Sequence, residues 1–208
     1  MSLKDLFKQK PPHGYEAHPT ILGKIWHFLA HEDSLASLIA DLLIVLFLSK
    51  YIIYPLIGLA LGTSFPFVVV VSSSMDHYNK DFDNWWEANK AWYLERNITK
   101  EQFQAFPFKD GFKKGDVFVV RGIKNISVGD VIIYTIPSQK DPIIHRVVNK
   151  SEDYYETKGD ANQGQFGFEK VVLPSQIKGK AVIKIPYLGW IKVGLFEIVS
   201  KIKSKIFK

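Results

Sequence analysis

The chain contains no cysteine among its 208 residues. This absence excludes disulfide bonds, thiolate metal sites and cysteine nucleophiles, and it leaves the redox compartment undetermined. Histidine metal sites are not indicated either, because no HExxH or similar spacing occurs. Four of the six histidines precede a long apolar segment, namely His13, His18, His27 and His31. The sequence therefore predicts neither a metal ion nor a cofactor.

Other patterns are also missing. There is no glycine-rich phosphate loop and no alternation of strands and helices of the βαβ type. The net charge of +6 is spread along the chain, without a basic stripe interleaved with aromatic residues, so nucleic acid is not an expected partner. A hydrophobic share of 47% excludes a disordered chain. The length suits one membrane anchor plus one domain of about 130 residues.

The longest apolar run is Leu38–Gly62. At ~1.5 Å per residue, a helix of this length exceeds the ~30 Å hydrocarbon thickness of a bilayer. Asp41 lies near its entry, and Lys50 lies in its middle, where a lysine costs ~2.5–3.5 kcal/mol. The surrounding apolar residues offset that cost, and a kink at Pro55 and snorkelling of the lysine would help further. We predict a transmembrane anchor over residues 37–63; a buried helix of a soluble protein is the alternative.

Lysine distribution predicts the orientation of this anchor. Lys4, Lys8, Lys10 and Lys24 precede it, and the next Lys or Arg after it is Lys80. The positive-inside bias places the N-terminus in the cytoplasm and the residues after Thr63 outside, as a single-pass protein of the cell membrane.

Two further segments are predicted to lie on the lipid bilayer. Residues 1–36 read as a cytoplasmic tail followed by a short amphipathic helix from Ile21 to Leu29, which Glu32 to Ser34 interrupts. Residues 191–208 place isoleucines on one helical face and most lysines off it, as in a basic amphipathic helix on anionic lipid. A partner-binding helix is the alternative for the second segment.

Residues 64–190 are typical of a mainly β domain. Short β-branched runs separated by glycine, aspartate and proline turns indicate an antiparallel, coiled sheet that closes partly on itself. The runs are Phe67–Val71, Val117–Val120, Val131–Tyr134, Ile143–Val148, Val171–Val172 and Ala181–Ile185.

Residues 76–111 interrupt this pattern with a helical, aromatic-rich insertion. Thr99 and Gln102 form a capping box before Phe103, and two short helices are expected. The aromatic residues suit a lid that packs over the site or rests at the level of the lipid headgroups. A small helical cap with its own core is the alternative.

Three blocks carry candidate chemistry. Three serines, Ser72 to Ser74, and Met75 follow the first strand; His145 lies within Ile143–Val148; and Asp160 follows Thr157-Lys158-Gly159. A serine, a histidine and an aspartate in this order are what nucleophilic acyl transfer requires. On their own, the serines are more typical of a turn.

These blocks resemble the type I signal peptidases, in the branch of archaea and the eukaryotic endoplasmic reticulum. That branch carries Ser-Met, then Ile-His-Arg-Val, then Thr-Lys-Gly-Asp, and the resemblance covers roughly Thr63 to Val193. It implies a signal-peptidase-like catalytic domain and a membrane-anchored serine endopeptidase.

The resemblance also implies roles for individual residues. Ser74 would be the nucleophile, His145 the general base, and Ser72 and Met75 would belong to the oxyanion and substrate-binding region. Ser73 would point away. A second aspartate about six residues after Asp160 often orients the histidine in this branch, but Gln165 and Phe166 occupy that region here. We therefore expect Asp160 to orient His145, with Glu169 as a distant candidate.

The implied substrates are the signal peptides of secretory preproteins, bound as an extended chain along Phe67–Val71 with small side chains one and three residues before the cleaved bond. An association with the protein translocation channel is a further implied partner. Two alternatives remain open: a self-cleaving repressor-type protease, against which the membrane segment argues, and a membrane-anchored binding or assembly module that uses the same β domain without catalysis.

Overall fold

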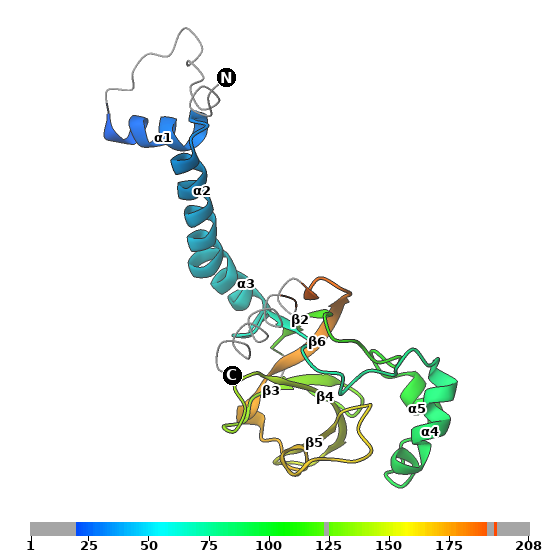
Figure 1. The fold of residues 1–208 in the computed structure, drawn as a ribbon. Helices are drawn as coiled ribbons and strands as arrows, with labels where there is room; N and C mark the ends of the chain where they lie inside the picture. The colour runs from blue at the N-terminus through cyan, green and yellow to red at the C-terminus, as the bar shows by residue number, and fades with distance from the viewer. Residues whose placement is uncertain (1–19, 123–124, 191–193, 195–208) are drawn as a thin grey trace, which may run out of the picture. The chain divides into compact units, whose positions relative to one another are not determined.

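The computed structural model describes residues 20–122, 125–190 and 194, and it divides into two compact units, 1–56 and 57–208 (Figure 1). The predicted C-terminal amphipathic helix, 191–208, and most of the N-terminal tail lie outside the described residues. The predicted domain boundaries stay predictions.

Two helices begin at hydroxyl caps in the first unit. In α1 (Ile21–His31), the Thr20 hydroxyl accepts a hydrogen bond from Gly23 N, and in α2 (Leu35–Leu48) the Ser34 hydroxyl accepts one from Ser37 N. The break between them falls at residues 32–34, where the sequence predicts it. The buried Ser37 hydroxyl donates to Phe28 O at 2.7 Å, which links the two helices across this break.

Helix α2 continues through a π-helical turn, η1 (Ser49–Ile53), into α3 (Tyr54–Leu61). Among the described residues, Leu35–Leu61 is the one helix long and apolar enough to span a membrane. Its large apolar side chains are mostly exposed, as lipid contact requires. The π-helical turn directly precedes Pro55, whose ring and missing N–H disturb the regular hydrogen-bond ladder.

The second unit is built on a six-stranded sheet in which every neighbouring pair is antiparallel, in the order β1-β2-β6-β3-β4-β5 (Figure 1). The predicted mainly β fold is therefore confirmed. The strands are β1 (Phe67–Val69), β2 (Val117–Arg121), β3 (Val131–Tyr134), β4 (Ile143–Lys150), β5 (Tyr155–Lys158) and β6 (Ile177–Ile185).

Three details of the sheet differ from the prediction. Strand β5 was not expected, because alternating Tyr155 and Thr157 give a weak pattern. Val172 makes only an isolated bridge with Tyr155. Strand β1 ends at Val69, although Val70 still bonds Asp116 O through its N–H and Gly115 N through its carbonyl. The serines therefore follow in a bend and turn, held close to the strand's end.

The insertion forms α4 (Phe82–Leu94) and α5 (Lys100–Gln104), and the predicted capping box at Thr99 and Gln102 is present. Its aromatic side chains pack in a buried cluster of Phe82, Trp85, Trp86, Tyr93, Ile98, Phe103 and Val148. Because they face one another and β4, the insertion has the form of a small helical cap with its own core.

The insertion leaves and rejoins the sheet at one place. Phe112 N donates to Met75 O at 3.0 Å, immediately after the insertion ends. Gly111 has φ +70°, and a Cβ atom there would lie 2.4 Å from Met75 O, so the close approach requires glycine.

Candidate active site

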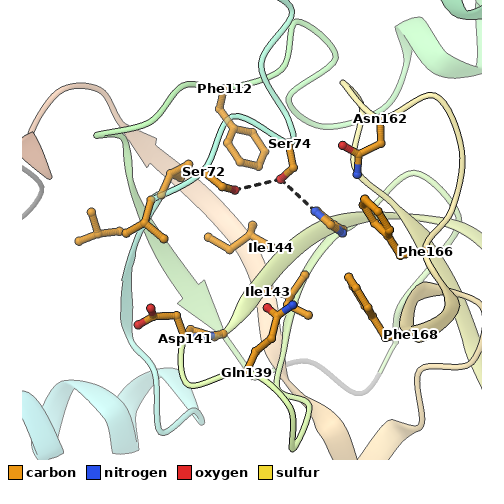
Figure 2. Close-up of a pocket in the computed structure, with 15 residues that line it drawn as sticks. Ser72, Ser74, Phe112, Gln139, Asp141, Ile143, Ile144, Asn162, Phe166 and Phe168 are labelled. Carbon is orange, nitrogen blue, oxygen red and sulfur yellow. Dashed lines mark hydrogen bonds between the residues drawn. The ribbon is translucent and has the colours of Figure 1, made fainter.

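Ser74 and His145 are in contact. Their side chains come from the turn after β1 and from β4, and Ser74 Oγ lies 2.9 Å from His145 Nε2 (Figure 2). Ser72 Oγ lies 3.1 Å from Ser74 Oγ, on the side of Ser74 away from His145 (Figure 2). The sequence prediction that these three side chains share a site agrees with this geometry, although a turn and not strand alternation aligns the two serines.

The backbone around Ser74 is fixed by the segment after β5. Ala161 N donates to Ser74 O at 2.8 Å, and Asp160 N contacts Met75 Sδ at 3.2 Å. A Cβ atom at Gly159 would lie 2.7 Å from Ser74 O, so glycine allows this close approach. The Lys-Gly-Asp motif therefore holds the serine turn in place.

Met75 lies elsewhere than predicted. Its side chain is 1% exposed and belongs to the apolar core that also contains Phe112, Phe118 and Val120. Met75 does not line the pocket beside Ser74. An unbranched, polarisable side chain suits this filling role, and we correct its assignment from substrate contact to core packing.

The carboxylate next to His145 is that of Glu169. Its Oε1 lies 2.5 Å from His145 Nδ1, and the side chain is completely buried. The contact lacks the alignment of a hydrogen bond, so Nδ1 has no well-aligned acceptor among the described residues. Glu169 itself is held by two backbone donors, Gly159 N at 3.0 Å to Oε1 and Phe166 N at 2.6 Å to Oε2. Three contacts therefore fix the carboxylate beside the imidazole.

Asp160, which the sequence analysis assigned to His145, instead contacts Arg146 and His77. Arg146 Nη2 donates to Asp160 Oδ2 at 2.7 Å and Nε donates to Oδ1 at 3.0 Å, while His77 Nε2 lies 3.4 Å from Oδ2. No hydrogen bond or ion pair joins Asp160 to His145 within the described ranges. Because neighbouring residues of a strand point to opposite faces, His145 faces Ser74 and Arg146 faces Asp160.

Arg146 ties this network to the insertion. Its guanidinium also donates to Pro107 O, Phe108 O and Gly129 O at 2.7–2.9 Å. His77 stacks on Trp85 with ring centroids 3.9 Å apart. Burial by itself raises the pKa of Asp160, but the Arg146 charge and hydrogen bonds from His77 and Arg146 outweigh it and lower that pKa to about 2. Asp160 is thus an ionised anchor of the insertion.

Lys158 is a buried cation that the sequence analysis did not single out. Its Nζ donates to Gly159 O at 3.0 Å and to Tyr93 Oη at 3.4 Å, and it lies 5.0 Å from the centre of the Trp92 ring. Burial lowers the pKa of Lys158 to about 8, against the opposing effects of Asp160 and Glu169. The signal available in the sequence is the place of Lys158 inside the Thr157-Lys158-Gly159-Asp160 motif.

A pocket of about 320 Å³ opens beside Ser74 and His145. One part is lined by Val69 to Ser72, another by Pro142 to Ile144, and a third by Asn162, Phe166 and Phe168 (Figure 2). Gln139, Asp141 and Phe112 complete the lining. No residue of α4 or α5 lines it, so the lid interpretation of the insertion gains no support. The described residues contain no cluster of His, Cys, Asp and Glu that could hold a metal ion.

The sequence has relatives among curated proteins. The chain is 32% identical over 98 residues to the signal peptidase complex catalytic subunit SEC11 of Colletotrichum graminicola, covering 41% of this chain and 57% of that protein. The subunit of the same name from Zygosaccharomyces rouxii is 33% identical over 98 residues, covering 41% and 59%. In Saccharomyces cerevisiae it is 24% identical over 164 residues, covering 73% and 78%.

This chain is similar to signal peptidase catalytic subunits. The resemblance predicted from the three motifs is thereby confirmed. The chain spans less than two thirds of the length of the first two signal peptidase subunits. No protein-family model matches the chain.

Proposed function

We propose that the chain is a membrane-anchored serine endopeptidase that removes signal peptides from secretory preproteins. The observation that carries the proposal is the contact of 2.9 Å between Ser74 Oγ and His145 Nε2 inside a pocket open to solvent. The similarity to signal peptidase catalytic subunits supports the choice of substrate. In this proposal Ser74 is the nucleophile and His145 the general base.

The proposed reaction is acyl transfer in two steps. His145 Nε2 accepts the proton of the Ser74 hydroxyl as Ser74 Oγ bonds to the scissile carbonyl carbon. The resulting imidazolium then gives that proton to the leaving amine as the peptide C–N bond breaks. Water, deprotonated by His145 in turn, hydrolyses the acyl-enzyme and restores the serine hydroxyl.

Ser72 and Glu169 have supporting roles in this scheme. The Ser72 hydroxyl, 3.1 Å from Ser74 Oγ, would donate to the oxyanion together with Ser74 N–H. Glu169 replaces Asp160 in our assignment as the carboxylate that stabilises protonated His145, because its oxygen lies at Nδ1. Asp160 would act at a distance, by holding the Lys-Gly-Asp segment and the insertion.

An extended substrate suits the pocket. Val69 to Val71 lie at the end of β1, which is an edge strand of the sheet. The main chain of Val70 bonds Asp116 and Gly115, so the alternating groups of Val69 and Val71 would be the ones to pair with a peptide. The apolar side chains of this segment and of Ile143 and Ile144 would receive small side chains one and three residues before the cleaved bond. The apolar helix Leu35–Leu61 would hold the enzyme beside membrane-inserted substrates.

Orientation and partners belong to the same proposal. The lysines before the anchor favour a cytoplasmic N-terminus and an extracytoplasmic catalytic domain in the cell membrane, with the translocation channel as a neighbour. External protease added to sealed right-side-out vesicles should digest the domain or reach its exposed loops. Complete protection that is lost on detergent lysis would contradict this orientation.

The test of activity uses the full chain in detergent or proteoliposomes with a secretory preprotein. Cleavage after a small residue at the end of the signal peptide is the expected result, and Ser74→Ala should abolish it. A folded native protein that neither cleaves nor is labelled at Ser74 by a serine-directed probe would overturn the proposal and favour the binding-module alternative.

A further inference from the structure

An aromatic pair forms one wall of the pocket. The rings of Phe166 and Phe168 stack with centroids 5.5 Å apart and an angle of 11° between them. Phe166 is 54% exposed. Both rings line the same cavity as Ser74 and His145 (Figure 2). An exposed aromatic surface inside the pocket of a proposed active site is a candidate contact for substrate.

The position of this pair relative to Ser74 indicates which part of a substrate it would meet. Figure 2 shows Ser72 on one side of Ser74 and the two phenylalanines on the other. The edge of β1 and the proposed oxyanion donor occupy the first side. A peptide that lies along Val69 to Val71 with its acyl half must therefore direct its leaving half towards His145, Phe166 and Phe168. The imidazole that protonates the leaving amine faces the same region.

Glu169 connects the aromatic pair to the catalytic histidine. Phe166 N donates to Glu169 Oε2 at 2.6 Å, while Oε1 of the same carboxylate lies 2.5 Å from His145 Nδ1. The backbone of Phe166 is thus fixed with respect to His145. The Phe166 ring therefore starts from a fixed backbone position near His145 and is oriented by its stacking on Phe168.

We propose that Phe166 and Phe168 form a subsite for the first side chain released after the scissile bond, and that this subsite favours an apolar side chain there. This inference rests on the proposed function. Contact with an exposed phenylalanine removes apolar area of both partners from water, at roughly 25 cal/mol per Å². An acidic side chain at the same place would lose hydration against the two apolar rings, which opposes its binding.

The experiment compares peptides that share an apolar segment and alanines one and three residues before the cleaved bond. They differ only in the next residue, which is leucine, glycine or aspartate. We expect native enzyme to have a kcat/KM about tenfold higher for leucine than for glycine, as for other apolar subsites. Phe166→Ala should reduce this ratio to about twofold, with the larger loss of kcat/KM for the leucine peptide. The Phe166 N–H, and hence the Glu169 contact, is kept in that variant.

Two controls make the result specific. Val171→Ala removes an exposed apolar side chain from outside the pocket and should retain the native preference. Binding of the same peptides to Ser74→Ala protein, measured by fluorescence anisotropy, reports the subsite without turnover. The leucine peptide should bind more tightly than the glycine peptide, and Phe166→Ala in that background should remove the difference.

The outcomes separate this inference from the proposed function. Cleavage by native enzyme with a leucine-to-glycine ratio that Phe166→Ala leaves unchanged would overturn the subsite alone. Absence of cleavage together with equal binding of all three peptides would overturn both. A fall in kcat/KM for every peptide alike would show that Phe166 acts through the loop and not as a subsite, which also contradicts the inference.

Discussion

His145 Nδ1 lies 2.5 Å from Glu169 Oε1, in a contact that the order of residues in the motifs does not suggest. Glu169→Gln keeps the shape but removes the charge that stabilises an imidazolium. Its amide has one oxygen where the carboxylate has two to accept from Gly159 N and Phe166 N. We expect kcat to fall by roughly 10²–10⁴-fold while the protein stays folded. Steady-state cleavage, with circular dichroism as the folding check, measures this. Glu152→Gln, at an exposed carboxylate between β4 and β5, is the matched control and should be near native. A nearly active Glu169→Gln enzyme would mean that Ser74 and His145 work without a carboxylate.

Alanine substitutions of the three serines should reduce the rate of cleavage to different extents. Ser74→Ala should abolish cleavage, because no other hydroxyl lies 2.9 Å from His145 Nε2 among the described residues. Ser72→Ala should be slower by roughly 10²-fold if its hydroxyl donates to the oxyanion. Ser73→Ala should remain near the native rate. Single-turnover cleavage of a preprotein separates the three, and retained activity in Ser74→Ala would reject the mechanism.

Asp160→Asn should act mainly on stability. The substitution leaves the buried Arg146 guanidinium without its carboxylate partner, which costs ~3–5 kcal/mol of unfolding free energy when one member of a buried pair is removed. Thermal or urea unfolding in detergent measures this.

Because the pKa of Asp160 is lowered to about 2, its favourable contribution is present above its unfolded pKa of ~3.9 and is lost as the pH falls through about 2. The gap in stability between native protein and Asp160→Asn should therefore narrow in acid. An unchanged midpoint with lost activity would instead support the direct catalytic role that the sequence suggested.

Lys158 should make stability rise with pH on the alkaline side. The pKa of Lys158 in the folded protein is about 8, below the ordinary lysine value of 10.5. Between these pH values the unfolded chain binds more protons, so the free energy of unfolding rises as the pH increases. Lys158→Met removes the cation and keeps the length of the stem. The difference in melting temperature between variant and native protein should favour the variant at pH 7 and shrink towards pH 9.5. A constant difference over that range would show that the buried lysine is not the titrating group.

How far the sequence allows prediction depends on the range of each interaction. The motifs that resemble the family single out Ser74 and His145, and the structure brings these two side chains into contact. Apolar alternation predicts most of the strands, and the structure has them. Glu169 reaches His145 only because a loop closes through a short 3₁₀ turn, Gly167–Glu169, which leaves no pattern in the sequence. The pairing of Asp160 with Arg146 depends on which face of β4 each side chain occupies. Met75 was misassigned because adjacency along the chain does not tell a pocket from a core.

The hydrogen bond from Phe112 N to Met75 O brings the two ends of the insertion, residues 76–111, together. A short turn could join these ends without moving β1 or β2, so the insertion is a natural place to shorten the protein or to substitute another segment. Such a deletion would remove Pro107 O and Phe108 O, which accept two hydrogen bonds from the Arg146 guanidinium. Any shortened version must therefore supply new carbonyl groups to that guanidinium or replace Arg146 and Asp160 together with an apolar pair of similar volume.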